Sequence, residues 1–151
     1  MHKVFLSYSK PINAQQTRIV KYIKSELGKH NILIFEVQNE TTNISPIYKI
    51  NSVIKQCTFF LCIAYEKEKI IGKDGVFKYT TSMWLDIEIA LAISNQIPFF
   101  VIKEDKINDT ALLNSVDGIE YYVLSNINNS EFDFEYLKHN IIPLLINRIT
   151  S

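Results

Sequence analysis

The residue types best suited to chemistry in this sequence gather at the start of one apolar segment. Ser82, Trp84 and Glu88 lie in the run Thr80–Ile93, where three hydroxyl residues lead directly into apolar residues. Such a run is typical of a helix start, because a side-chain oxygen can accept hydrogen bonds from the N–H groups of the first turn. Trp84 and Glu88 are four residues apart, so they would lie side by side on the helix. An aromatic ring that shields a carboxylate from water favours a functional Glu88; the alternative is a core anchor beside a solvated acid.

A second polar group follows a run of β-forming residues at the start of the chain. Lys3–Ser9 reads as a buried strand, and Ser7, Tyr8, Ser9 and Lys10 fall where that strand ends. Serine is common at strand ends for structural reasons, and Tyr8 would also suit packing beneath a loop. The binding and the structural interpretation of these residues both stay open at this point.

Hydrophobic periodicity predicts alternating strands and helices along the whole chain. The predicted strands cover 3–9, 32–35, 58–64, 98–102 and 119–124; the predicted helices cover 11–27, 46–56, 82–95 and 132–148, the last kinked at Pro143, with loops at 36–45 and 65–81. This alternation predicts a single α/β domain over residues 1–151, a flavodoxin-like three-layer sandwich with a five-stranded parallel sheet in the order 2-1-3-4-5.

The predicted strand order specifies where a ligand would bind. In open parallel sheets, ligands bind beyond the carboxyl ends of the strands, where the winding reverses, which here lies between the first and third strands. The residues after the first strand, 7–10, and the helix start at 82–88 are therefore expected to meet at one site.

Composition excludes several classes of function. Sixteen basic and sixteen acidic residues cancel, without a basic cluster, which argues against nucleic-acid binding. The longest apolar runs are too short to span a membrane, and Met1 leads directly into a strand without a signal peptide, so a cytoplasmic protein is expected. Cys57 and Cys62 are expected to be reduced core thiols on opposite faces of a strand. The scattered histidines, His2, His30 and His139, suggest no metal site.

The pattern as a whole resembles the Toll/interleukin-1 receptor (TIR) domain family. The opening Val4–Ser9 resembles the first family box, and Ser82-x-Trp84-x-x-x-Glu88 resembles the segment that carries the catalytic glutamate of enzymatic TIR domains. Pro98–Ile102 matches the fourth family strand. The segment 36–45 lacks the Pro-Gly pair common after the second family strand, and the third family box is not evident.

The resemblance implies an enzyme that breaks the nicotinamide–ribose bond of NAD. Glu88 would then be catalytic, while Ser7, Tyr8, Ser9, Ser82 and Trp84 would bind the substrate. NAD is the substrate rather than a cofactor, and the product is ADP-ribose or a cyclic ADP-ribose type signal. Lysines between 66 and 78 would attract the pyrophosphate, or form a solvated charged run. The family further implies self-association through TIR–TIR contacts and a bacterial antiphage system in which a separate effector protein responds to the product.

Two other functions stay open at this stage. One is a non-enzymatic adaptor module that assembles with other TIR domains. The other is nucleoside deoxyribosyl transfer, which uses the same fold plan and a similar glutamate–ribose chemistry, although the opening motif of that family does not occur here. A Gly-x-Gly-x-x-Gly or Walker-type phosphate loop is also absent from the sequence.

Overall fold

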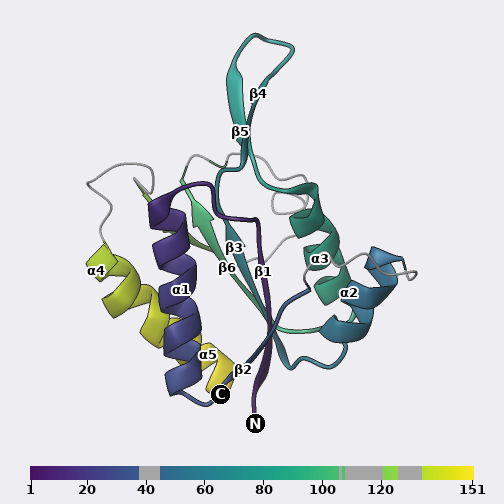
Figure 1. Ribbon diagram of the computed structural model, residues 1–151, viewed down its shortest axis with the longest axis vertical. Coiled ribbons are helices and arrows are strands. Elements are labelled where there is room, and N and C mark those ends of the chain that lie inside the picture. The colour runs from purple at the N-terminus through teal and green to yellow at the C-terminus, as the bar shows by residue number, and fades with distance from the viewer. Residues whose placement is uncertain (38–44, 106, 108–120, 126–133) are drawn as a thin grey trace.

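Five parallel strands form the central sheet of the chain (Figure 1). The structure is a computed structural model in which residues 1–37, 45–105, 107, 121–125 and 134–151 are described. The sheet order is β2-β1-β3-β6-β7, and each neighbouring pair is parallel. The strands are β1 (Lys3–Tyr8), β2 (Leu33–Phe35), β3 (Phe59–Ala64), β6 (Phe99–Glu104) and β7 (Tyr121–Leu124). The predicted order 2-1-3-4-5 is confirmed.

Helices cover both faces of this sheet, as the three-layer prediction requires (Figure 1). One face carries α1 (Ala14–Lys29) and the C-terminal helices α4 (Phe134–Tyr136), η1 (Leu137–Ile141) and α5 (Ile142–Thr150); the other carries α2 (Pro46–Ile54) and α3 (Met83–Ser94). Side chains along β1 alternate between the two cores, with Val4 and Leu6 on the α1 face and Phe5 on the α3 face. Every residue of β3 is buried, as expected for a central strand of a parallel sheet.

The first helix begins and ends later than its sequence pattern predicts. It begins at Ala14 because the Asn13 side chain caps it, accepting a hydrogen bond from the Gln16 N–H at 2.8 Å. It continues through Gly28, and Asn31 rather than this glycine takes the left-handed conformation that ends it, with φ of 56°. Asparagine tolerates that conformation better than most residues.

A β-hairpin occupies the segment predicted as a loop over 65–81. Its strands are β4 (Glu68–Ile71) and β5 (Phe77–Thr80), which pair antiparallel in a separate two-stranded sheet. Figure 1 shows the hairpin projecting away from the main sheet. Gly75 takes the left-handed conformation at its turn, with φ of 75°, as an Asp-Gly turn requires. The prediction of a long loop here was wrong.

The C-terminal helix accommodates its proline through a π-helical segment. η1 precedes Pro143, which stands at the start of α5. Proline cannot donate a backbone hydrogen bond and crowds the preceding turn, and the wider π turn relieves that conflict. The predicted beginning of this helix at residue 132 and the beginning of the last strand at 119 both lie outside the described residues.

The two cysteines share one core rather than opposite faces. Cys57 and Cys62 are free thiols, both buried in the core between the sheet and the helices α2 and α3. Cys57 precedes β3 instead of belonging to it, so strand alternation does not apply to it. Among the described helices, none combines the length and the apolar character needed to cross a membrane.

Candidate functional site

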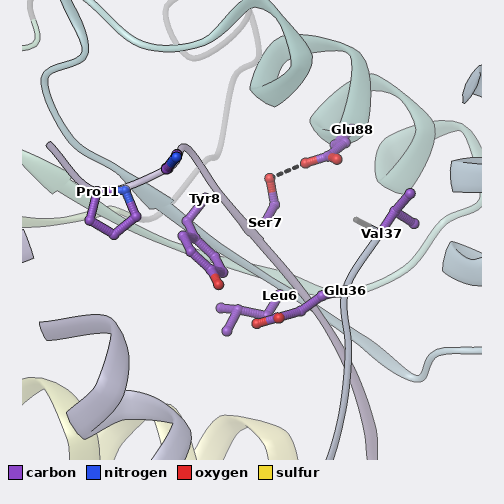
Figure 2. A pocket seen from close by; sticks show the side chains of 8 residues that line it. Leu6, Ser7, Tyr8, Pro11, Glu36, Val37 and Glu88 are labelled. Atoms are coloured by element: carbon purple, nitrogen blue, oxygen red, sulfur yellow. Dashed lines mark hydrogen bonds between the residues drawn. The ribbon is translucent and has the colours of Figure 1, made fainter. Parts of the chain in front are cut away.

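A pocket of about 530 Å³ lies at the carboxyl end of β1. Its lining comes from β1 and the residues after it, from the residues after β2, and from α3 (Figure 2). The eight lining residues are Leu6, Ser7, Tyr8, Lys10, Pro11, Glu36, Val37 and Glu88. The structure therefore brings residues after the first strand together with the third helix, at the edge of the sheet where the fold is expected to bind ligands.

Ser7 and Glu88 are in direct contact in this pocket. The Ser7 hydroxyl donates a hydrogen bond to Oε2 of Glu88, although the two residues are 81 positions apart in the sequence. Figure 2 shows both side chains pointing toward each other across the space between β1 and α3. Ser7 is buried and pairs with Cys62 of the central strand β3, so the sheet fixes its position in this contact.

Helix α3 sets the position of Glu88. Leu85, Ile89 and Ala92 are buried against the sheet, so the helix cannot rotate without losing its apolar contacts. Glu88 stands next to this stripe and therefore reaches the end of β1. The helix begins at Met83, where the Ser82 hydroxyl accepts a hydrogen bond from the Trp84 N–H at 3.4 Å.

Burial makes the Glu88 carboxyl group unusually basic. Desolvation raises its pKa from the ordinary value of 4.5 to about 7, against the opposing effect of the Ser7 hydrogen bond. The protonated and ionised forms are therefore both populated near neutral pH. A carboxyl group with a strongly perturbed pKa in a concave site is typical of functional residues.

A second acidic residue, Asp86, lies two positions before Glu88 in the sequence and does not line the pocket. Burial raises the pKa of Asp86, and one of its carboxylate oxygens is buried without a hydrogen-bond partner among the described residues. Burial and the nearby charges of Glu88 and Asp86 raise the pKa of the Cys62 thiol well above its usual range. Cys62 is thus an inert thiol beneath the site rather than a nucleophile.

The pocket lining also contains Glu36, whose ion pair with Lys24 sequence analysis missed. Lys24 of α1 lies 2.5 Å from Oε1 of Glu36, and its ammonium group also donates to the Tyr8 hydroxyl at 2.8 Å. Burial disfavours the charge on Lys24, but its hydrogen bonds to Glu36 and Tyr8 outweigh that effect and raise its pKa. The only sequence signal was the position of Glu36 directly after the second strand.

Three of the predicted substrate-binding residues do not line the pocket. Trp84 packs against the α3-side core, Ser9 is buried with no partner for its hydroxyl within the described part of the chain, and Ser82 caps α3. The hairpin lysines that were expected to attract a pyrophosphate do not line it either, as far as their side chains are described. The described residues contain no group of three or more His, Cys, Asp or Glu that could hold a metal ion.

Comparisons with known proteins give information on the fold. Neither a protein-family model nor a curated protein matches the sequence. Among solved structures, the CMP N-glycosidase BcmB of Clostridium botulinum is similar at 17% identity and a TM-score of 0.51, covering 80% of this chain and 87% of its own. A 2-deoxyribosyltransferase of Bacillus psychrosaccharolyticus has 15% identity and a TM-score of 0.51, covering 89% and 95%.

A third similar structure belongs to a much longer protein. The lysine decarboxylase LdcF of Francisella novicida has a TM-score of 0.56 at 10% identity, and the match covers 98% of this chain but only 17% of the decarboxylase. At these identities the three likenesses establish the α/β fold alone. The resemblance to TIR domains therefore stays a prediction from the sequence.

Proposed function

We propose that this protein cleaves the N-glycosidic bond between a ribose and its base, and that the substrate is NAD, which loses nicotinamide. The observation that carries this proposal is the half-buried Glu88 carboxyl group, which the Ser7 hydroxyl holds in the pocket at the end of β1. The Ser-x-Trp-x-x-x-Glu pattern, which resembles that of enzymatic TIR domains, supports NAD as the substrate.

The chemistry of NAD suits a site with one reactive carboxylate. Most glycoside hydrolases also need an acid that protonates the departing oxygen. Nicotinamide instead leaves from a cationic ring nitrogen, which takes the electron pair of the C1′–N bond and departs neutral without a proton. The ribose then carries positive charge as an oxocarbenium ion, which the ionised Glu88 would stabilise. Attack by water at C1′ gives ADP-ribose and releases one proton; attack by a nitrogen or hydroxyl of the same molecule gives a cyclic product.

The remaining pocket residues have supporting roles in this proposal. The Ser7 hydroxyl orients the carboxylate and favours its ionised form, and the Tyr8 ring forms a wall against which a flat base can lie. Ser82 and Trp84 act indirectly. Ser82 caps α3, and the Trp84 ring, which belongs to α3, packs against the core between α3 and the sheet and keeps water out of it.

The family resemblance extends the proposal to the biological setting. We propose that NAD is consumed as a substrate without a bound cofactor, and that copies of the chain associate through TIR–TIR contacts. The ribosyl product would act on a separate effector protein in a bacterial antiphage system.

A second candidate function is cleavage of a nucleoside or nucleotide. Its support is the fold shared with a CMP N-glycosidase and a 2-deoxyribosyltransferase, both of which act on bonds between a base and a sugar. The same Glu88 would stabilise the ribosyl or deoxyribosyl cation in that reaction.

Product identification separates these candidates. Concentrated protein is incubated separately with NAD, CMP and a 2′-deoxynucleoside, and the products are resolved by chromatography and mass spectrometry. We expect nicotinamide from NAD, together with ADP-ribose or a product lighter by one water. Base release from CMP or the deoxynucleoside alone would favour the second candidate. Absence of release from all three would contradict the enzymatic proposal and support an adaptor module.

A further inference from the structure

A second carboxylate, that of Glu36, lines the same pocket as Glu88. We propose that Glu36, held in place by Lys24, accepts a hydrogen bond from the 2′-hydroxyl of a second ribose and makes the site selective for a dinucleotide in which that hydroxyl is free. The inference rests on the proposed function for the identity of the ligand. It concerns a part of the pocket to which the cleavage chemistry assigns no role.

The two carboxylates lie on opposite sides of the end of β1. Ser7 points toward Glu88 and α3, whereas Leu6 and Tyr8 point toward the other face of the sheet (Figure 2). Glu36 belongs to that other face, because it pairs with Lys24 of α1. A ligand that fills the pocket therefore meets one carboxylate on each side of the strand.

Two carboxylates on opposite sides of one strand in the same pocket suit a ligand with two sugars. NAD carries two riboses joined by a pyrophosphate, so one ribose can lie at Glu88 while the other lies at Glu36. A pocket of about 530 Å³ is within the range of small-molecule sites. A mononucleotide has a single ribose and can satisfy only one of the two carboxylates.

The surroundings of Glu36 prepare it to bind hydroxyl groups. An ionised carboxylate only accepts hydrogen bonds, and with Oε1 buried against Lys24, Oε2 is the oxygen left to accept one from a ribose hydroxyl. Lys24 holds Oε1 at 2.5 Å and also contacts the Tyr8 hydroxyl, so the carboxylate and the ring form one fixed unit. The Glu36 side chain keeps 23% exposure, which leaves it accessible from the pocket.

Selectivity follows from the charge of this group. An acidic residue just after the second strand hydrogen-bonds the ribose 2′-hydroxyl in other dinucleotide-binding α/β folds. A phosphate at that position removes the donor and brings negative charge against the carboxylate, which disfavours binding. The site should therefore prefer NAD to NADP.

The test measures binding separately from turnover. Dissociation constants for NAD and NADP are determined by calorimetry in a Glu88→Gln background, with Glu36 intact and with Glu36→Gln. With Glu36 intact, we expect NAD to bind at least about tenfold more tightly than NADP. In the Glu36→Gln variant, we expect this preference for NAD over NADP to fall below about threefold. Glu26→Gln is the matched control, because it removes an ion pair to Lys29 of 2.6 Å outside the pocket lining, and it should leave the preference unchanged.

The outcomes separate this inference from the proposed function. The role of Glu36 would be overturned if the preference for NAD over NADP were the same with Glu36 intact and with Glu36→Gln. It would also be overturned if neither nucleotide bound. A lower thermal midpoint in Glu36→Gln with the preference retained would make Glu36 a structural link between β2 and α1. If Glu36→Gln does not fold, Glu36→Asp keeps the charge but withdraws it from the ligand, and it too must weaken the preference. If the preference for NAD over NADP depends on Glu36 but the wild type releases no nicotinamide, only the proposed cleavage reaction is contradicted.

Discussion

Glu88 experiences two opposing effects at the residue scale. Burial between β1 and α3 disfavours its charge, whereas the hydrogen bond from Ser7 favours it, and burial is the larger effect. The result is a carboxyl group with a pKa of about 7, which can be ionised near neutral pH in a partly desolvated position. A charge of this kind interacts more strongly with a cationic ribose than a solvated carboxylate would.

The first prediction concerns the pH dependence of catalysis. If ionised Glu88 acts on the substrate, kcat/KM for base release rises with pH through about 7 and falls about tenfold for each unit below that value. Ser7→Ala removes the hydrogen bond that favours the ionised form, so its profile should shift to higher pH. Initial rates across a buffer series measure both profiles, and a wild-type midpoint near the ordinary glutamate value would contradict the assignment.

The second prediction concerns stability. Because the pKa of Glu88 is higher in the folded state than its ordinary value of 4.5, folded protein binds more protons, and stability is lost as pH rises from about 4.5 to 7. The Glu88→Gln variant has no carboxyl group at this position, so it does not lose this stability as the pH rises. We expect it to be more stable than wild type by about 1–3 kcal/mol near pH 8 and nearly equal near pH 5.

Urea unfolding at both pH values measures this difference. Other titrating groups, such as Asp86, are present in both proteins and cancel in the comparison. A difference in unfolding free energy that does not change with pH would show that Glu88 titrates normally.

At the scale of elements, α3 is the helix that the sequence specified best. Its three leading hydroxyl residues, its apolar stripe and its start near Ser82 were all readable from spacing, and the structure has Ser82 as the cap residue. Trp84 was harder to place. Four-residue spacing puts it beside Glu88, but spacing does not say which neighbour faces the pocket and which faces the core.

The third prediction tests the role of Ser82 as a cap. Ser82→Ala should lower the free energy of unfolding by about 0.5–1 kcal/mol, because the first turn of α3 loses a hydrogen-bond acceptor. KM should stay within about twofold, since Ser82 does not line the described pocket. Ser94→Ala, at the exposed last residue of α3, is the control for loss of a serine hydroxyl. A large rise in KM without loss of stability would return Ser82 to the binding site.

The β4–β5 hairpin was missed because its apolar residues come mainly as two adjacent pairs, Ile70-Ile71 and Val76-Phe77, separated by glycines and charged residues. The strands of an exposed hairpin need no buried face. The alternation of apolar and polar residues that identifies a core strand is therefore weak in them. Its exposed residues, Ile71, Val76 and Phe77, lie outside both described cores. The Asp74-Gly75 turn was the available signal.

The fourth prediction follows from this exposure. Replacing residues 71–77 by Asn-Gly joins Ile70 to Lys78, which are paired in the hairpin, through a two-residue turn. The free energy of unfolding should change by less than about 1 kcal/mol, because exposed side chains contribute little to stability. Denaturant titration measures it. A larger loss would mean that the distal hairpin packs against the rest of the chain.

At the scale of the whole molecule, the sheet order joins distant parts of the sequence. The order 2-1-3-4-5 was predictable because strands and helices alternate, and it specified the edge of the sheet at which residues 7–10 and 82–88 would meet. The contact between Ser7 and Glu88 follows from that topology. The Lys24–Glu36 pair was not predictable, because its two residues look like ordinary charged positions on a helix and a loop until the strands are placed.

The proposed role of Glu88 in cleaving the bond between ribose and base is tested by the rate of nicotinamide release from NAD, compared between wild type and Glu88→Gln. Asp86→Asn is the matched control, since it removes a carboxylate from the same helix without changing the pocket lining. We predict a loss of at least about a hundredfold in kcat for Glu88→Gln and less than about threefold for Asp86→Asn. Equal release by wild type and Glu88→Gln would contradict the assignment of Glu88.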